Sequence, residues 1–403
     1  MVENAKKPAI RFAGFTDAWE QRKLEEYLSV SSEKNADDAY DKTDVLSVSG
    51  DYGIVNQIEF QGRSFAGVSV SNYGVVRTGD VVYTKSPLNS NPYGIIKTNK
   101  GKTGIVSTLY AVYRPKENTY PDFVQTYFEQ HARMNNYMHP LVNKGAKNDM
   151  KVSSENALKG YVIFPNYEEQ KAISEYFAVI DDLITLHQRK YDKLQNVKKS
   201  MLEKMFPKNG SVVPEIRFAG FTDAWEQRKL GEISDKVTEK NAGLQYVETL
   251  TNSAEFGVIS QRDFFDHSIS KIDSLDGYYI VRSEDFVYNP RISVTAPVGP
   301  VNRNKLGRNG VMSPLYTVFR PHDVDNIYLE HFFKSRYWHS YMNFNGDSGA
   351  RSDRFSIKDE LFFQMPIPTP HIEEQQKIGA FLTSLDDLIT LHQREPKHIK
   401  NNK

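Results

Sequence analysis

The sequence predicts an α+β protein made by tandem duplication of one unit, a mixed β-rich globule with short helices that is followed by a long helix. The segment Ile10–Leu24 recurs letter for letter as Ile216–Leu230. The nonapeptide DDLITLHQR occurs as Asp181–Arg189 and again as Asp386–Arg394, each time in a stretch with helical spacing. Because both repeats are offset by almost the same distance, the whole chain is a duplication of a unit of about 205 residues, too large for a solenoid repeat.

The composition limits the class of protein. A chain of 403 residues predicts two to three domains, and a hydrophobic content of 39% is enough to build their cores. The absence of cysteine excludes disulfides, thiolate zinc sites and cysteine nucleophiles. The N-terminus lacks the apolar core of a signal peptide, and no apolar run approaches membrane-spanning length. We therefore expect a soluble protein of the cytoplasm with no membrane contact.

The charge is balanced overall but unevenly distributed. The formal net charge is zero, yet residues 85–151 hold ten Lys and Arg against four Asp and Glu, and residues 291–354 hold nine against five. Local basic surfaces on a neutral chain suit a protein that contacts DNA with two faces and protein with the remainder.

Each half begins with the repeated opening. Asp17 and Glu20 have capping-box spacing, which predicts a short helix. We expect Trp19 and Trp225 to be core anchors rather than ligand-stacking residues.

Residues 43–115 predict strands and turns, because they are rich in Val, Ile and Tyr and are punctuated by Gly and Asn. One amphipathic helix is expected in each half, around Pro121–Met138 and Asn326–Met342, followed by a turn with glycine and basic residues. The scaffold residues match between the halves, whereas the loops at 85–103 and 290–310 do not. A common framework with different loops is expected of two readers with two different targets.

The long helices carry a heptad seam. In Glu168–Phe206 the seam residues recur at alternating spacings of four and three and are apolar except for His187 and Lys198; they are Ile173, Phe177, Ile180, Ile184, His187, Tyr191, Leu194, Lys198, Met201 and Met205. In the second copy the seam comprises Ile378, Leu382, Leu385, Ile389 and His392. We expect the two helices to pack on each other; the alternative is that each packs only on its own domain.

These features predict four segments. They are a first domain (1–167), a long helix (168–207), a second domain (208–372) and a shorter helix (373–403). Pro396 falls inside the second helix, and a proline removes a backbone hydrogen bond and clashes with the preceding turn. We expect the second helix to be shortened or frayed there.

The chain resembles the specificity subunits of type I restriction-modification systems. The matching features are the RFAGFTDAWEQRKL opening of each half, the proline-containing entry to Glu-Glu-Gln before each helix, and the DDLITLHQR helix itself. The resemblance covers essentially the whole chain, twice and in order.

The resemblance implies a non-catalytic DNA reader. Two target-recognition domains would each read one part of an asymmetric bipartite sequence in double-stranded DNA. Two helices packed as an antiparallel coiled coil would space these domains and dock two methyltransferase subunits, which in turn would carry the restriction (translocase and nuclease) subunits. S-adenosylmethionine, ATP and Mg²⁺ are expected on those partners, and this chain is expected to bind no cofactor or metal. A helix of 39 residues is roughly 60 Å long, enough to space domains over half-sites about 34–36 Å apart.

The alternative to a DNA reader is that this chain is itself an enzyme. The segments Asn91–Tyr93 and Asn289–Arg291 each lack part of an amino-methyltransferase motif, and Phe12–Thr16 lacks a glycine of an S-adenosylmethionine loop. No phosphate-binding loop and no His-Glu-x-x-His helix are present. We expect no catalytic residues here and interpret His187 and His392 as packed seam residues rather than metal ligands.

The DNA contacts are expected in the divergent loops and the glycine-basic turns. Arg and Lys bind guanine or phosphate, and Asn can read adenine. The predicted DNA-binding residues are Lys85, Asn89, Asn91, Lys97, Lys144, Lys147, Asn148, Asn289, Arg291, Arg303, Arg308, Arg351 and Arg354. The alternative for each residue is that it belongs to a charged loop exposed to solvent and contacts no DNA. For the whole chain, the rival function is a duplicated protein-interaction scaffold without a DNA role.

Overall fold

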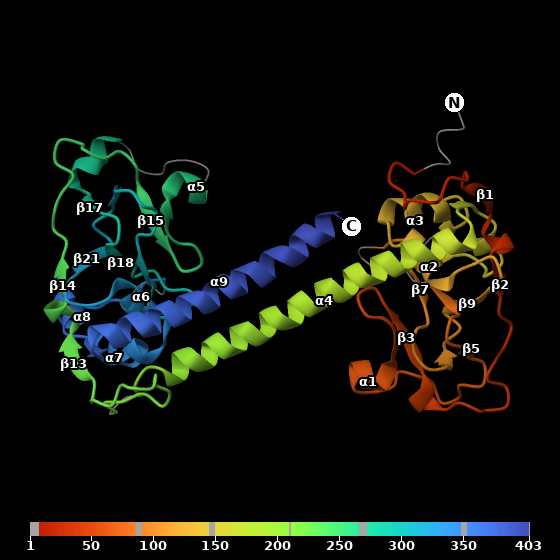
Figure 1. Cartoon of the computed structure of the whole chain (residues 1–403), viewed down its shortest axis with the longest axis horizontal. Coiled ribbons are helices and arrows are strands. Elements are labelled where there is room, and N and C mark those ends of the chain that lie inside the picture. The colour runs from red at the N-terminus through yellow and green to blue at the C-terminus, as the bar shows by residue number, and fades with distance from the viewer. Residues whose placement is uncertain are drawn as a thin grey trace. The chain divides into compact units, whose positions relative to one another are not determined.

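The computed structural model describes residues 8–85, 91–144, 150–208, 211–265, 272–347 and 353–402. It divides into two compact units, Met1–Leu183 and Ile184–Asn402, so that the boundary falls within the first long helix (Figure 1). Both units mix short strands and helices, which agrees with the α+β prediction.

The first unit contains a four-stranded antiparallel sheet in the order β2-β9-β6-β7 and the strand pairs β1–β12, β3–β4, β5–β8 and β10–β11. In chain order its elements, ending with the helix that continues into the second unit, are β1 (Glu20–Lys23), η2 (Leu24–Glu26), β2 (Leu28–Val30), η3 (Lys42–Asp44), β3 (Leu46–Ser49), β4 (Gly53–Asn56), α1 (Gln57–Gln61), β5 (Gly74–Val76), β6 (Val81–Thr84), β7 (Ile96–Thr98), β8 (Gly104–Val106), β9 (Tyr110–Pro115), α2 (Pro121–Phe128), α3 (His131–Met138), β10 (Asn143–Lys144), β11 (Met150–Lys151), η4 (Asn156–Leu158), β12 (Tyr161–Phe164) and α4 (Tyr167–Lys204).

The second unit repeats this topology, with the sheet β14-β21-β18-β19 and the pairs β13–β22, β15–β16 and β17–β20. Its elements are β13 (Glu226–Lys229), η5 (Leu230–Glu232), β14 (Ser234–Lys236), β15 (Leu250–Ser253), β16 (Gly257–Ser260), α5 (Gln261–Phe265), η6 (Ile272–Gly277), β17 (Tyr279–Val281), β18 (Phe286–Tyr288), β19 (Val301–Arg303), β20 (Gly310–Met312), β21 (Thr317–Pro321), α6 (Asn326–Lys334), α7 (Tyr337–Asn345), α8 (Asp359–Phe363), β22 (Pro366–Thr369) and α9 (Ile372–Asn402).

The repeated opening folds differently from the prediction. Asp17 caps no helix, and Glu20–Lys23 is instead strand β1, which pairs antiparallel with β12 just before α4. The second copy does the same through β13 and β22. The partner strand provides hydrogen bonds for the backbone N–H and C=O groups of the opening, so local capping chemistry does not decide the structure of this segment. Trp225 is buried in the core of its unit as predicted.

The helix predicted in each half is broken into two. In the first unit α2 ends at Phe128 and α3 begins at His131, and in the second α6 ends at Lys334 and α7 begins at Tyr337. The Ser335 hydroxyl donates a 2.6 Å hydrogen bond to the carbonyl of Phe332, which competes with continuation of the helix.

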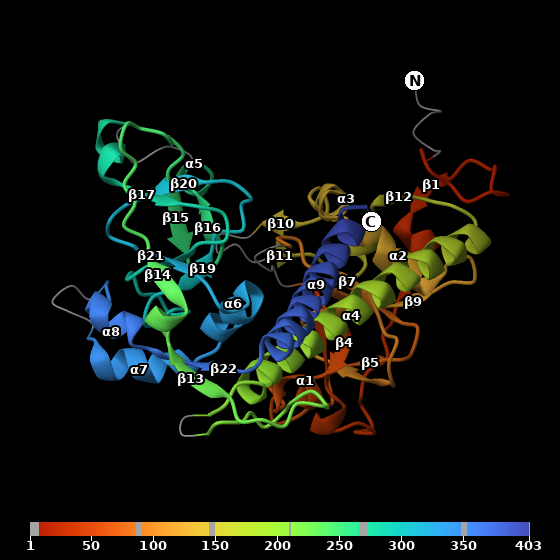
Figure 2. The ribbon, with the colours of Figure 1, turned by 60° about the vertical axis from the view of Figure 1, so that its left-hand side comes forward.

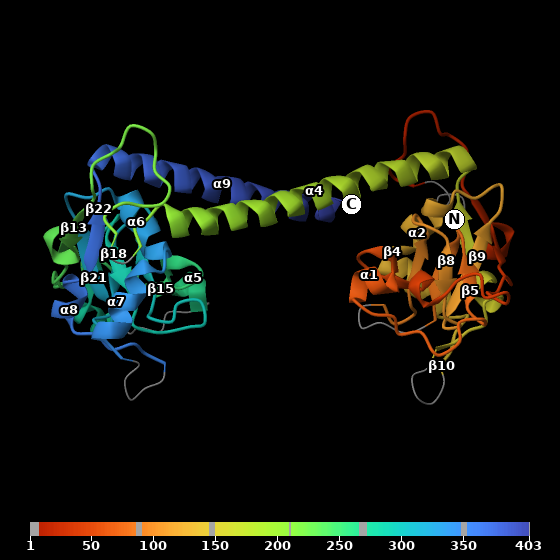
Figure 3. The ribbon, with the colours of Figure 1, turned by 90° about the horizontal axis from the view of Figure 1, so that it is seen from below.

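From Ile180 to Leu194 the predicted seam residues of α4 are partly buried, while the residues on either side of each are exposed. In the second unit the end of α4 and the beginning of α9 cover one side of the β-rich part (Figure 3), and Met205, Phe206, Ile378, Leu382 and Leu385 join one buried cluster with its core residues. Helix α6 packs against α9 (Figure 2). The α9 seam therefore contacts both the domain and α4.

Helix α9 does not end at Pro396, contrary to the prediction, but continues to Asn402. Pro396 is buried, and the residue before it, Glu395, lies 3.0 Å from the Nε2 atom of His187 on α4. The proline forfeits the hydrogen bond to the carbonyl of His392 and crowds that carbonyl, and we attribute the continuous helix to this anchoring.

Each long helix is joined to its domain by a buried arginine–carboxylate pair in its first turn. Arg11 donates two hydrogen bonds of 2.6 Å to Glu169, and Arg217 donates two of 2.7 and 2.9 Å to Glu374. Both carboxylates are essentially inaccessible to solvent. Such two-pronged pairs fix orientation as well as position.

The glutamine that follows completes each joint. The side chain of Gln170 accepts from the backbone of Tyr120 and donates to Pro165, at 2.9 Å each. The side chain of Gln375 accepts from Asp325 and donates to Pro370, at 2.8 Å each. The Glu-Glu-Gln motif thus ties the helix to both the preceding strand and the first of the short helices.

We predict that Glu374→Gln lowers the free energy of unfolding by roughly 3 kcal/mol, because it leaves the Arg217 charge without its partner. Denaturant unfolding of the full chain measures the effect. The control is Glu373→Gln, at the exposed neighbouring position. Equal stability of the two variants would contradict this role of the pair.

Candidate functional site

In the second unit the structure brings together predicted residues that are far apart in the sequence. Asn289 follows β18, and its Nδ2 donates 2.8 Å to the carbonyl of Asn252 while its Oδ1 accepts from the backbone of Arg291 at 3.0 Å. Arg291 forms a β-bridge with Arg354. The divergent loop and the residues that follow the glycine-basic turn therefore form one surface.

Arg291 is the most available of these cations. Its side chain is 66% exposed, and its ion pair with Asp353 is long, at 3.9 Å. Arg354 is half-buried. The two arginines lie side by side, which is an arrangement able to contact a phosphate and a base edge together.

Two other predicted arginines are held by carboxylates. Arg303 is 12% exposed and pairs with Glu330 at 2.7 Å and with Glu284 at 2.5 Å. Arg308 forms a two-pronged pair with Glu248 at 2.8 and 2.7 Å. A DNA contact by either arginine has to compete with these pairs, so we interpret both first as parts of the framework.

In the first unit Lys85 lies half-buried directly after β6, and burial lowers the pKa of its ammonium group. Lys97, in β7, is buried and pairs with Glu129 at 3.0 Å. Asn91 is half-buried and accepts from the backbone of Gly94 at 3.0 Å. Lys144 belongs to strand β10. The predicted residues Asn89, Lys147, Asn148 and Arg351 lie outside the described residues.

Sequence reasoning missed a hydrogen-bonded pair of asparagines, Asn252 and Asn302, next to Asn289. Asn252 donates 2.7 Å to the carbonyl of Val287 and accepts 2.7 Å from Asn302. Asn252 is nearly inaccessible to solvent, and Asn302 is half-buried. Residues 250–253 read LTNS, which does not predict a buried strand, so the burial of this amide has no signal in the sequence. Buried amides require partners, and Asn252 finds them in Val287 and Asn302. The pair fixes the β15–β16 hairpin against Asn289.

His187 and His392 contact each other, with 2.9 Å between their Nδ1 atoms. Glu395 lies on the other ring nitrogen of His187. No group of three His, Asp or Glu side chains in the described ranges is arranged to hold a metal ion. The geometry is that of packed seam histidines that bond to each other.

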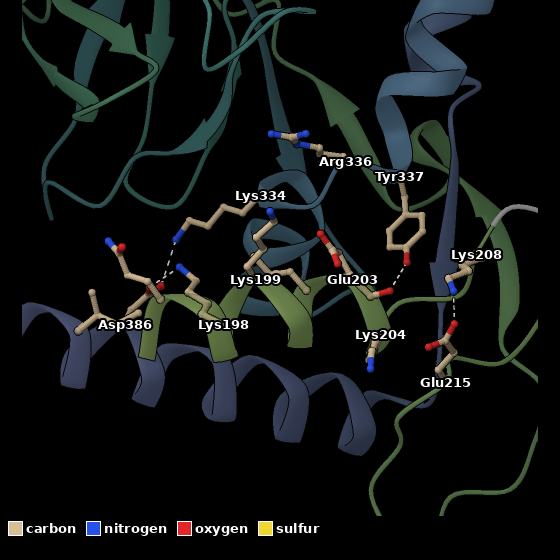
Figure 4. A pocket seen from close by; sticks show the side chains of 13 residues that line it. Lys198, Lys199, Glu203, Lys204, Lys208, Glu215, Lys334, Arg336, Tyr337 and Asp386 are labelled. Atoms are coloured by element: carbon tan, nitrogen blue, oxygen red, sulfur yellow. Dashed lines mark hydrogen bonds and ion pairs between the residues drawn. The ribbon is translucent and has the colours of Figure 1, made fainter. Parts of the chain in front are cut away.

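A groove of about 730 Å³ in the second unit lies between the end of α4, the α6–α7 corner and α9. Figure 4 shows Lys198 and Lys334 reaching the same carboxylate, Asp386, and the Tyr337 hydroxyl donating to the carbonyl of Glu203. Lys208 pairs with Glu215. These contacts bind the end of α4 to the second domain.

Among the described residues, no helix is both long and apolar enough to cross a membrane.

Comparison with known proteins gives a consistent result. Residues 222–401 match the family described as "Type I restriction modification DNA specificity domain". The chain is 24% identical over 428 residues to the putative type I restriction enzyme MjaX specificity subunit of Methanocaldococcus jannaschii, covering 100% of this chain and 94% of that protein. It is 24% identical over 253 residues to the MjaVIII specificity subunit of the same organism, covering 59% and 58%.

The fold is similar to that of the S subunit of a type I restriction-modification system from M. genitalium. The TM-score is 0.50 at 11% identity, and the likeness covers 98% of this chain and 96% of that one. At this identity the similarity concerns the fold alone.

We predict a pH-dependent role for Glu330, which accepts from Arg303, Lys305 and Lys334. Burial raises the pKa of its carboxyl, but these cations lower it more and hold it at about 2, against an ordinary value of 4.5. The stabilisation of the folded state by the Glu330 carboxylate is therefore complete above about pH 4.5 and is lost as the pH falls through about 2. At pH 7, Glu330→Gln should cost roughly 3 kcal/mol, and the deficit should shrink below pH 4.5.

Unfolding free energies of the wild type and the variant across pH 2–7 test this. The control is Glu360→Gln, at an exposed position of α8. A deficit that does not vary with pH would contradict the electrostatic cause.

Proposed function

We propose that the chain is a specificity subunit of a type I restriction-modification system and selects the DNA sequence on which that system acts, a proposal supported by the domain match over residues 222–401 and by the specificity subunits to which the chain is similar. Each half reads one part of an asymmetric bipartite target. The observation that carries the proposal is a repeated framework, with the same sheet order in both units, in which segments of unlike sequence connect β6 to β7 (residues 85–95) and β18 to β19 (residues 289–300). Identical frameworks with unlike loops suit two readers of unlike half-sites.

The long helices act as the spacer, packed as an antiparallel coiled coil. Two contacts support this arrangement: His187 bonds to His392, and Lys198 pairs with Asp386. Of these two contacts, the one later in the sequence of α4 (Lys198) meets the residue earlier in the sequence of α9 (Asp386). This is the order expected of antiparallel helices with a heptad seam.

The same helices dock the methyltransferase subunits. The repeated nonapeptide turns its seam residues inward and leaves two leucines outside in each copy: Leu183 and Leu186 are 42% and 46% exposed, and Leu388 and Leu391 are 43% and 48% exposed. Leucines three apart share one helix face. Two equal apolar sites suit two copies of one partner, which would carry the restriction subunits.

DNA contact rests on the surface of Asn289, Arg291 and Arg354 in the second domain, and on Lys85, Asn91 and the glycine-basic turn in the first. S-adenosylmethionine, ATP and Mg²⁺ belong to the partner subunits, and the chain is not catalytic by itself. A reader of the host's DNA works in the cytoplasm, which we propose as the location.

A duplicated scaffold without a DNA role remains the rival. It accounts for the paired helices and the neutral net charge. It does not account for an exposed arginine in a segment whose sequence differs between the halves. Salt-dependent DNA binding separates the two proposals.

Exchange of residues 1–167 for another recognition domain should change one half-site of the target and leave the other unchanged, because the two readers are separate units. Sequencing of methylated DNA from cells that carry the chimaera measures both half-sites. The reciprocal exchange of residues 208–372 is the matched control. Simultaneous change of both half-sites would contradict modular reading.

Arg291→Ala should weaken DNA binding by the complex with its methyltransferase about tenfold at physiological salt. The slope of log affinity against log salt should fall by about 0.9, the value for one phosphate contact. Arg394→Ala, which removes an exposed arginine of α9, is the control for loss of a surface charge. An unchanged affinity and slope in Arg291→Ala would remove this residue from the interface.

A further inference from the structure

Each recognition domain carries an exposed pair of aromatic rings at the same place in its fold. In the first unit Tyr52 lies in the β3–β4 turn and Phe60 lies in α1, with ring centroids 5.1 Å apart. In the second unit Phe256 lies in the β15–β16 turn and Phe264 lies in α5, at 6.2 Å. These side chains are 69%, 45%, 60% and 39% exposed, respectively. We call each pair with its flanking acids the aromatic–acidic patch.

The patch is a further repeat in the sequence. Residues 49–60 read SGDYGIVNQIEF and residues 253–264 read SAEFGVISQRDF, with serine, acid, aromatic ring, glycine, glutamine, acid and phenylalanine in register. The neighbouring loops diverge between the halves, but this segment does not. It therefore serves something that both halves have in common.

Folding accounts for only part of this segment. The Ser49 hydroxyl accepts from the backbone of Tyr52 at 3.2 Å, and the Ser253 hydroxyl accepts from Phe256 at 3.3 Å. Gly53 has φ 73°, which favours glycine at this turn. These features shape the turn, and the rings contact each other. None of them requires the outer faces of four large rings to remain in water, where apolar surface is unfavourable.

The charge beside the rings indicates the kind of partner. Each ring directly follows a carboxylate in the sequence: Asp51, Glu59, Glu255 and Asp263. Residues 49–61 contain no Lys or Arg, and residues 253–265 contain only Arg262. Paired carboxylates repel a phosphate backbone, whereas aromatic anchors inside a polar rim are typical of protein interfaces.

We propose that the aromatic–acidic patch is a docking surface for a partner protein that presents an apolar pocket with a basic rim, and that one copy of this partner binds each domain. The inference rests on the proposed function, in which the methyltransferase subunit is the partner present twice. The patch adds a second contact to the helix leucines.

The patch is also connected through hydrogen bonds to the loop that is proposed to read the DNA. In the second unit the β15–β16 hairpin that carries Phe256 contains Asn252, which is hydrogen-bonded to Asn289. A partner bound at the hairpin is thereby fixed relative to the loop that reads the DNA. This places the methyltransferase beside the half-site that its domain recognises.

The test uses the full chain with the methyltransferase subunit of the same system and two double variants, Tyr52→Ser with Phe60→Ser and Phe256→Ser with Phe264→Ser. Native mass spectrometry over a concentration series gives the affinity for each copy. Each double variant should bind one copy at least tenfold more weakly and the other normally. Methylation should fall at one half-site, the one read by the altered domain.

Two further variants keep the test independent of folding. Phe344→Ser removes an aromatic ring that is 89% exposed on α7 and should change nothing. Glu255→Lys with Asp263→Lys keeps the rings but reverses the charge, and it should weaken the second copy. Thermal unfolding verifies that each variant is folded.

The proposal is overturned if both serine variants keep two normally bound copies. It is equally overturned if they lose DNA affinity while partner affinity is intact, because the patch would then contact DNA. A wild-type chain that binds no methyltransferase would contradict the proposed function itself, and would be evident before any variant is compared.

Discussion

The organisation of this protein depends on a buried arginine–carboxylate pair that occurs twice. Arg11 with Glu169 and Arg217 with Glu374 fix the first turn of each long helix to the domain that precedes it. A helix used as a spacer transmits position only if its ends are rigidly attached, and a two-pronged ion pair allows little rotation. The repeated opening is retained in both halves because it provides the arginine of this joint and the strand that pairs with the helix entry.

The framework and the reading surface obey different constraints. Carboxylates occupy several cations that would otherwise suit DNA, such as Arg303 with Glu330 and Arg308 with Glu248. Arg291 has only a distant carboxylate and remains exposed. Burial and pairing thus divide one set of basic residues into structural and available members, and the exposed Arg291 lies between β18 and β19, where the sequences of the two halves differ.

The sequence predicted the duplication, the strand-rich domains and the long helices, because identical repeats and a heptad seam are properties of the chain alone. It did not predict that Glu20–Lys23 is a strand, since β1 exists through its pairing with β12. Nor did it predict the continuous helix through Pro396, which depends on contacts between Glu395 and His187 on another helix. The bridge between Arg291 and Arg354 could not be predicted from the sequence either, because it joins residues 63 positions apart. Tertiary partners decided each of these features.

The most direct measurement for the central claim is a genome-wide map of methylated adenines in cells that contain this chain and the methyltransferase subunit proposed as its partner, compared with cells that lack this chain. A duplicated reader predicts one asymmetric split motif, with two unrelated half-sites and a fixed gap, that disappears when the chain is absent. A methylation pattern that is identical without the chain, in cells where the complex forms, would contradict the account.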